Sequence, residues 1–461
     1  MQQDYNWDAA VGKERFLLCP SIGGIDSMWF CTWAVWPRAR TTTGVWTWRI
    51  SFGISAGGDV RLPAMTIEIR QPTDDEFGPL CRVDGRAFGF AYTDEEVEKQ
   101  RPWHDMTRFR IAVESGRIVS VAGSYAKEVT LPGGSTVPMG GVTWVSTAAT
   151  HRRQGLARRV IDAVHADLDE RGEPLASLYA SEGGIYENFG YGVASLVRLT
   201  SIDTRRARLR REYEVASTGT RYLEDDEVVA TITKIWERFR RTRAGEVQVG
   251  RAERQFLVGL ESKPAEGMSA ALYLANRDGF AAYRVTMNWN DGHPAHSMRI
   301  TQLAAVTPEA HLALWQTLLG VDLVGSITTR QLPIDDPLPY LLDNPRVVRT
   351  TELNDGVWLN ARDIATCFGT RTYRTEDRLV VEADGRRWQI EGGPTGALCK
   401  SVRTKPDLVT SHGWLSALLY GGVQPSSLVA GRRMTARNAD VLRRADLFFP
   451  TSLAPHCQTH Y

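Results

Sequence analysis

The feature that most constrains the fold is an apolar strand that runs through a threonine turn into an amphipathic helix, a unit that occurs twice. In the first copy, residues 143–164 read TWVSTAATHRRQGLARRVIDAV, and apolar side chains continue at helical spacing to Leu168 before a stop at Gly172. Residues 302–322, QLAAVTPEAHLALWQTLLGVD, show the same order. Apolar strands and helix faces must be buried against one another. The sequence therefore predicts a repeated α/β layer, with chance similarity of the two joins as the alternative.

The rest of the chain also alternates between strand and helix patterns. Alternating apolar residues indicate strands, and apolar residues at a spacing of 3.6 indicate helices. Expected strands lie at 108–113, 118–126, 138–146, 175–180, 268–276, 279–287, 300–306, 379–383 and 387–391, and expected helices at 94–100, 152–171, 228–243, 308–319 and 407–418. Because 461 residues exceed the usual size of one hydrophobic core, we expect about three domains.

Residues 1–64 differ from the rest of the chain. They hold six of the fourteen tryptophans and show no helical or strand period. Met65 then begins MTIEIRQPTDDEF, which is typical of a short strand followed by an acidic helix start. We interpret residues 1–64 as a mis-assigned translation start or a poorly ordered extension, and a genuine additional segment is the alternative.

Charge and cysteine content argue against several classes of protein. The 55 basic and 54 acidic side chains leave a net charge of +1, without the basic domain that is typical of a nucleic-acid-binding protein. No apolar run reaches the roughly 18 residues of a membrane span, and the opening MQQDYNWD does not resemble a signal peptide. Six scattered cysteines without CxxC spacing favour a reduced, cytoplasmic protein, and no closed ligand set predicts a metal.

The turn before the first helix of the repeat carries an anion-binding pattern, RRQGLAR at 152–158. A helix N-terminus presents unpaired N–H groups and a partial positive charge, which together bind phosphate. Gly155 lets the backbone approach an anion closely, and Arg152, Arg153 and Arg158 add positive charge. Taken alone, this pattern is equally compatible with an ordinary basic helix start, because neither GxGxxG nor GxxxxGK[ST] is present.

Two blocks together resemble a known superfamily. The strand at 142–146 followed by RRQGLA at 152–157 resembles the acyl-coenzyme A loop of the GNAT acetyltransferases. The block ASEGGIYENFGYG at 180–192 is similar to the hallmark of the Eis family, named for enhanced intracellular survival, whose members resemble multi-acetylating aminoglycoside N-acetyltransferases. A weaker resemblance extends from Met65 to Tyr461, which is nearly all of the chain outside the unusual N-terminal segment.

The resemblance implies an architecture and an assembly. It implies a catalytic GNAT domain at 65–212, a degenerate GNAT-like domain at 213–350 and a domain similar to sterol carrier proteins at 351–461. It also implies a homohexamer. The fold class expected from these observations is therefore mixed α/β (α+β), with tandem GNAT domains of which the second is degenerate.

The resemblance further implies roles for individual residues. The coenzyme contacts that it implies are Val145, Ser146, Thr147, Arg153, Gln154, Gly155, Leu156, Ala157, Arg158, Ser181 and Glu182. Tyr186 matches the general acid, and Tyr461 matches the last residue, whose free α-carboxylate acts as general base. A phenol with a pKa near 10 can protonate a thiolate, whereas an α-carboxylate, with a pKa near 3.5, needs a desolvated cavity or a bridging water to accept an amine proton. The alternatives are a packed aromatic for Tyr186 and a frayed chain end for Tyr461.

The sequence therefore predicts transfer of acetyl from acetyl-coenzyme A to a primary amine, which could be an aminoglycoside, another polyamine or a lysine side chain. His460 stands where some family members have an acidic residue, so it weakens the expectation of an aminoglycoside. The alternative is a non-catalytic protein that binds lipid or another apolar ligand in its C-terminal domain. The intact RRQGLA loop and Tyr186 favour the enzyme, because the second copy of the unit lacks these arginines and this glycine.

Overall fold

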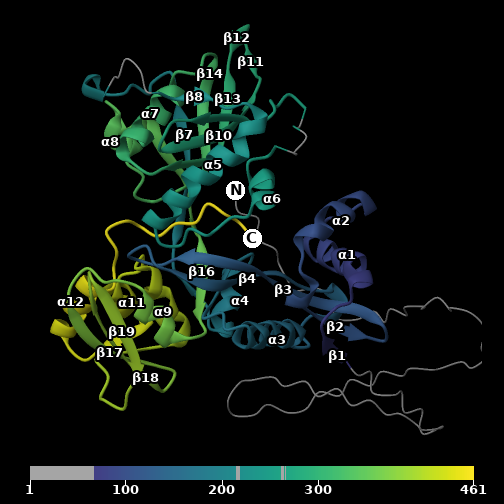
Figure 1. Ribbon diagram of the computed structural model, residues 1–461, viewed down its shortest axis with the longest axis vertical. Helices are drawn as coiled ribbons and strands as arrows, with labels where there is room; N and C mark the ends of the chain where they lie inside the picture. Colours follow the sequence, from purple (N-terminus) through teal and green to yellow (C-terminus); the bar gives the residue numbers. More distant parts are fainter. Residues whose placement is uncertain (1–66, 214–218, 261–263, 265) are drawn as a thin grey trace, which may run out of the picture. The chain divides into compact units, whose positions relative to one another are not determined.

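The computed structural model describes residues 67–213, 219–260, 264 and 266–461 (Figure 1). The prediction for residues 1–64 lies outside the described residues. Within these ranges, strands and helices alternate, and the strands form three larger sheets and one short hairpin, β11 (Trp289–Asn290) with β12 (His293–Pro294). No helix of this part of the chain is long and apolar enough to cross a membrane.

A seven-stranded sheet carries the expected coenzyme residues. Its strands, in spatial order, are β1 (Ile67–Arg70), β2 (Phe109–Glu114), β3 (Arg117–Thr130), β4 (Thr136–Thr147), β5 (Leu175–Tyr179), β16 (Val357–Ala361) and β6 (Gly192–Val193). The strands β4 and β5 are parallel, but their pairing starts at Met139 opposite Leu175 and ends at Gly141 opposite Ser177. Beyond this pair both strands continue without pairing to each other, and we call the place where they separate the opening of the sheet.

Helices cover both faces of this sheet. The helices α1 (Phe77–Phe88) and α2 (Asp94–Gln100) lie on one face and α3 (Leu156–Glu170) lies on the other (Figure 1). The predicted helix 94–100 is confirmed, because Thr93 and Glu96 form a capping box at its start. The helix predicted from 152 begins only at Leu156, because residues 152–155 form the turn that leads into it.

A second seven-stranded sheet repeats the arrangement. Its strands, in spatial order, are β15 (Val348–Asp355), β7 (Leu196–Asp203), β14 (Val324–Leu332), β13 (His296–Ala305), β10 (Gly279–Thr286), β9 (Leu272–Ala275) and β8 (Arg221–Tyr222). The helix α5 (Asp225–Phe239) packs on β9, β10 and β13. The helix α7 (Pro308–Leu319) joins the parallel strands β13 and β14, as α3 joins β4 and β5. The repeated strand–helix unit is therefore confirmed.

The two large sheets exchange strands. The strand β7 follows the first sheet in sequence but pairs with β14 and β15 of the second sheet. The strand β16 follows the second sheet in sequence but pairs with β5 and β6 of the first. The two sheets therefore do not correspond to the contiguous ranges 65–212 and 213–350, because hydrogen bonding between strands is indifferent to their distance along the chain.

The C-terminal part forms a smaller mixed layer. It contains a five-stranded sheet, β19 (Gly396–Ser401), β18 (Arg386–Gly393), β17 (Asp377–Ala383), β20 (Leu408–Thr410) and β21 (Met434–Ala436), with α9 (Ile364–Thr370), α10 (His412–Ala417), α11 (Pro425–Ala430) and α12 (Ala439–Phe448). The prediction of a helix at 407–418 is wrong for its first residues, because the helix α10 begins only at His412. Residues 408–410 pair in parallel with residues 381–383, so tertiary strand pairing overrides the local helical pattern.

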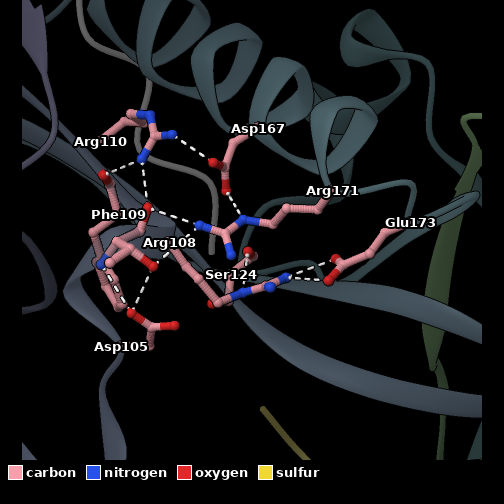
Figure 2. A network of polar contacts seen from close by, with 9 residues as sticks. Asp105, Arg108, Phe109, Arg110, Ser124, Asp167, Arg171 and Glu173 are labelled. Atoms are coloured by element: carbon pink, nitrogen blue, oxygen red, sulfur yellow. Dashed lines mark hydrogen bonds and ion pairs between the residues drawn. The ribbon is translucent and has the colours of Figure 1, made fainter.

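A charged network fastens the end of α3 to β2 (Figure 2). Arg108 Nη2 donates to both carboxylate oxygens of Glu173, at 2.8 and 2.6 Å, and both side chains are buried. The carboxylate of Asp167 accepts hydrogen bonds from Arg110 Nη2 at 2.6 Å and from Arg171 Nε at 2.7 Å. The helix that carries the anion-binding turn is thus tied to the sheet at its other end.

We predict that Glu173→Gln lowers the free energy of unfolding by about 3–5 kcal/mol, because it leaves the buried Arg108 guanidinium without its counter-charge. Denaturant unfolding measures the change. The matched control is Glu170→Gln, an exposed glutamate at the end of the same helix, for which we expect a change within about 0.5 kcal/mol. Equal stability of the two variants would show that the buried pair does not stabilise this domain.

Candidate active site

The turn at the start of α3 is shaped for an anion. Arg153 and Gly155 both have left-handed backbone conformations, with φ of 64° and 75°, and Gly155 is the N-cap residue. No side chain caps the helix, and its first turn contains no acidic residue. A Cβ on Gly155 would meet nothing within 4 Å, so the space above the free N–H groups is open. Residues 152–155 and Arg158 are exposed, as a site for a soluble phosphate compound requires.

The corresponding turn of the second copy has lost these properties. The hydroxyl of Thr307 accepts a hydrogen bond from the Ala310 N–H at 3.2 Å, and Glu309 lies in the first turn of α7. A capped helix start with a negative side chain disfavours a second anion. The contrast supports the prediction that only the first unit binds the coenzyme.

The end of β4 is irregular where it passes the opening. Its register on β3 shifts between Thr143, which pairs with Gly123, and Ser146, which pairs with Val121, so Trp144 and Val145 have no partner in this register. Trp144 has φ of 54°, a left-handed conformation that marks a β-bulge. A bulge leaves backbone N–H and C=O groups without a partner on the neighbouring strand, so these groups are available to bind a ligand.

Hydrogen bonds from Ser120 on β3 hold the last residues of β4. The Ser120 hydroxyl donates to the Ser146 carbonyl at 2.8 Å and lies 2.8 Å from the Thr147 hydroxyl. Ser120 is fully buried and belongs to no motif, so the sequence did not reveal it.

Tyr186 ends the short helix α4 (Gly183–Tyr186) and is only 5% exposed. Its ring packs edge-on against Tyr191, with centroids 6.2 Å apart, and tilts against Phe189 at 6.3 Å. Burial, and secondarily the charge of Glu182, raises the pKa of the Tyr186 phenol, so the phenol keeps its proton at neutral pH. Ser181 and Glu182 lie exposed just before this helix.

Arg158 connects the two blocks that carried the resemblance. Its Nη2 donates to the Asn188 carbonyl at 3.2 Å, and its guanidinium lies 4.8 Å from the centroid of the Phe189 ring. The start of α3 and the segment that carries Tyr186 are therefore in direct contact.

The last residue of the chain lies at the opening of the sheet. The Tyr461 hydroxyl is 2.7 Å from Ser177 Oγ, and its ring lies so close to Gly141 that a Cβ there would be 2.6 Å from Cδ2. Gly141 and Ser177 form the final pair between β4 and β5. The ring of Tyr179 meets that of Tyr461 edge-on, at 5.4 Å.

Six hydrogen bonds to four residues, Tyr179, Leu303, Glu246 and Ala244, hold the segment before Tyr461. The hydroxyl of Tyr179 donates to the Cys457 and Thr459 carbonyls, both at 3.1 Å. The Gln458 side chain accepts from the Leu303 N–H at 3.1 Å and donates to the Leu303 carbonyl at 2.9 Å. The remaining two contacts are the Gln458 N–H with Glu246 Oε2 at 3.2 Å and the His456 N–H with the Ala244 carbonyl at 2.9 Å. The chain end is thus anchored rather than frayed.

His460 stacks on Tyr179, with centroids 4.1 Å apart. His460 is exposed, but the protein around it partly desolvates the imidazole, and this desolvation, together with the charge of Arg330, lowers the pKa of His460. The imidazole is therefore mainly neutral at pH 7. It adds neither the negative charge of an acidic residue nor a lasting positive charge beside the chain end.

Three family models match the chain. One acetyltransferase (GNAT) domain model matches residues 68–194, another matches residues 247–362, and a sterol carrier protein domain model matches residues 371–458. The predicted fold class, two GNAT domains followed by a domain similar to sterol carrier proteins, is confirmed.

The N-acetyltransferase Eis of Mycobacterium tuberculosis is 30% identical over 408 residues, which cover 84% of this chain and 98% of that protein. The chain belongs to the Eis family of N-acetyltransferases. As a member of this family it is an acyltransferase, and the resemblance predicted from residues 142–192 is confirmed. An uncharacterized N-acetyltransferase of Streptomyces avermitilis is 29% identical over 407 residues, 85% of this chain and 98% of that protein.

Solved structures agree with this membership. Eis1 from Mycobacterium abscessus matches with a TM-score of 0.75 and 27% identity, over 86% of this chain and 100% of that one. A GCN5-related N-acetyltransferase from Anabaena variabilis matches with a TM-score of 0.73 at 15% identity, over 86% of this chain and 100% of its own, and shows the shared fold alone.

Proposed function

We propose that this Eis-family protein transfers the acetyl group of acetyl-coenzyme A to a primary amine at the opening between β4 and β5. The observation that carries the proposal is the anchored chain end, because six hydrogen bonds hold residues 456–459 and the Tyr461 ring packs on Gly141 at that opening. Chain ends are usually poorly ordered unless they are tied down, so a docked end supports a role at this place.

The proposed coenzyme contacts are those that the family resemblance implies, and the local geometry supports them. The pyrophosphate is held by the N–H groups at the start of α3 and by the arginines beside them. The pantetheine arm lies along the bulged end of β4. The residues of this proposed site are Val145, Ser146, Thr147, Arg153, Gln154, Gly155, Leu156, Ala157, Arg158, Ser181 and Glu182. Leu156 is buried, so it contributes its backbone rather than its side chain.

The proposed chemistry needs one base and one acid. The Tyr461 α-carboxylate accepts the proton of the acceptor ammonium, and the freed nitrogen attacks the thioester carbon. A backbone N–H on the bulged strand near Val145 stabilises the negative oxygen that forms on this carbon. As the carbon–sulfur bond breaks, Tyr186 gives its phenolic proton to the departing thiolate and later regains one from solvent.

The alternative function, storage of an apolar ligand in the C-terminal domain, has less support. Tyr373 stacks on Phe448 with centroids 4.0 Å apart, and Phe368 and Phe449 complete this buried aromatic group. These rings belong to the packed hydrophobic core of the domain. The homohexamer and the cytoplasmic location stay predictions.

A thiol-release assay with acetyl-coenzyme A tests the proposed function. The acceptors are a simple alkylamine, a linear polyamine, an aminoglycoside and a lysine peptide, each beside an analogue with hydroxyl in place of the amine. We expect turnover well above coenzyme hydrolysis for at least one amine and for no hydroxyl analogue. Release of thiol at the hydrolysis rate with every amine would contradict the proposal.

A further inference from the structure

A buried carboxyl on α1 is not explained by packing. Asp84 is 5% exposed and lies on the helix face that packs against β4, one turn beyond Leu80 and Cys81. Among the described residues it forms no ion pair, and its Oδ1 has no hydrogen-bond partner. An unpaired carboxylate in a protein interior is unfavourable, so its presence on this helix calls for a functional or structural reason.

A second unsatisfied group faces Asp84. The Ser146 hydroxyl, also 5% exposed, lies close enough to the Asp84 carboxyl to lower its pKa, yet Ser146 Oγ forms no well-aligned hydrogen bond in the described part of the chain. Asp84 Oδ1 and Ser146 Oγ therefore each have an unused hydrogen-bonding position, and one further polar group beside them can bond to both. Because Ser146 belongs to the bulged end of β4, this position is beside the opening of the sheet.

Aromatic rings surround this position, and we call Tyr92, His104, Tyr125 and Trp144 the aromatic cluster. Tyr92 stacks on Trp144, with centroids 6.0 Å apart and planes 5° apart, and a Cβ on Gly85, next to Asp84, would lie 3.3 Å from the Tyr92 ring. Trp144 Nε1 donates to the Tyr125 hydroxyl at 3.1 Å, and this hydroxyl is 2.8 Å from His104 Nε2. Three of the rings are thus joined by hydrogen bonds, and the fourth, Tyr92, packs on Trp144.

The aromatic cluster reaches the chain end through Lys127. Its ammonium lies 5.9 Å from the ring centroids of both Tyr125 and Tyr461. The charge of Lys127 is neutralised by an ion pair with Glu253. Lys127 therefore lies close to both the aromatic cluster and the ring of Tyr461, whose α-carboxylate is the proposed base.

The ionisable groups around Asp84 offer it no positive charge. Burial raises the pKa of Cys81 to about 11 and that of Tyr92 and Tyr125 to about 12, so all three are neutral at pH 7. Burial lowers the pKa of His104, which is neutral as well. Burial also raises the pKa of the Asp84 carboxyl to about 6, so at pH 7 most molecules carry an unpaired negative charge there.

We propose that Asp84 binds the ammonium group of the acceptor, with the Ser146 hydroxyl as its second contact and the aromatic cluster against the body of the molecule. This inference rests on the proposed function and names its substrate class. One buried carboxylate beside aromatic rings suits a primary alkylamine with a single positive charge and an apolar or aromatic body, rather than a polycation.

Steady-state kinetics with 2-phenylethylamine and aniline test this proposal. The first compound is a cation at pH 7 and the second is a neutral amine of related shape. We expect Asp84→Asn to raise KM for 2-phenylethylamine roughly 10- to 100-fold, the range for a lost hydrogen bond to a charged group. KM for aniline and for acetyl-coenzyme A should stay unchanged, and the exposed Asp75→Asn should match the wild type throughout.

Thermal unfolding separates binding from a structural role. The pKa of Asp84 is higher in the folded state than the ordinary value of 3.8, so its ionisation costs stability as pH rises through about 4–6. Asp84→Asn removes this cost, so its melting temperature at pH 7 should equal or exceed that of the wild type. A lower melting temperature with a higher KM for both substrates would assign Asp84 a structural role and overturn the proposal.

Two further outcomes would also overturn the proposal. One is an unchanged KM for 2-phenylethylamine in Asp84→Asn, and the other is a large fall in kcat with KM unchanged. Calorimetric titration of 2-phenylethylamine into the protein with coenzyme A present makes the same comparison without turnover. If the wild-type protein binds this amine through Asp84 but acetylates none, the proposed function fails while the binding site stands.

Discussion

Two extra glycines after Tyr461 are expected to reduce kcat for acetyl transfer by about 10²–10⁴-fold, the contribution of a lost general base. The extension replaces the α-carboxylate by an uncharged peptide group and moves the free carboxylate two residues away. The anchoring of residues 456–459 does not involve that carboxylate, so the segment can remain docked. The measurement is thiol release under saturating amine and acetyl-coenzyme A.

Two controls accompany the extended protein. Tyr461→Phe keeps the α-carboxylate and loses only the hydroxyl contact with Ser177, so its kcat should stay within about tenfold of the wild type. An unchanged melting temperature of the extended protein would show that its fold is intact. Full activity of the extended protein would refute the proposed base, whatever the amine.

Tyr186→Phe is expected to lower kcat by about 10²–10⁴-fold with little change in KM for either substrate, because it removes the proton donor and keeps the ring. Since burial raises the pKa of Tyr186 above its ordinary value near 10, ionisation of this phenol should not limit kcat of the wild-type protein below about pH 10. A pH profile of kcat checks the second statement.

Tyr191→Phe is the matched control for Tyr186→Phe. Tyr191 is fully buried in the same segment, and its hydroxyl is 2.8 Å from His165 Nε2. Its loss should cost about 1–3 kcal/mol of stability and leave kcat nearly unchanged. If the two variants lower kcat equally, Tyr186 acts through the packing of this segment and is not the acid.

Much of the fold was predictable because its signals are local. The helix 308–319 was predicted with its correct bounds from an amphipathic pattern that follows a threonine turn. The exchange of β7 and β16 was not predictable, since neither strand differs in pattern from its neighbours. The helix prediction for residues 408–410 was wrong for the same reason, because these residues pair with β17, some 27 residues earlier along the chain.

The candidate site also contains residues that could be recognised from the sequence and residues that could not. Residues 152–158 are neighbours in the chain, so the sequence alone showed an anion-binding pattern there, which was equally compatible with an ordinary basic helix start until the family resemblance was added. The role of Tyr461 came only from the resemblance to the Eis family. Ser120, Asp84 and the aromatic cluster belong to no motif and could not be recognised before the strands and helices were assembled.

The sequence by itself determined the repeated strand–helix unit, the turn into α3 and the family. Each of these depends on residues within a few turns of one another, whose spacing is visible in the printed chain. Only the tertiary structure decided that the chain end docks at the opening between β4 and β5, and that Asp84 faces Ser146. These contacts join residues hundreds and tens of positions apart, and they exist because packing and hydrogen bonding act on distance in space.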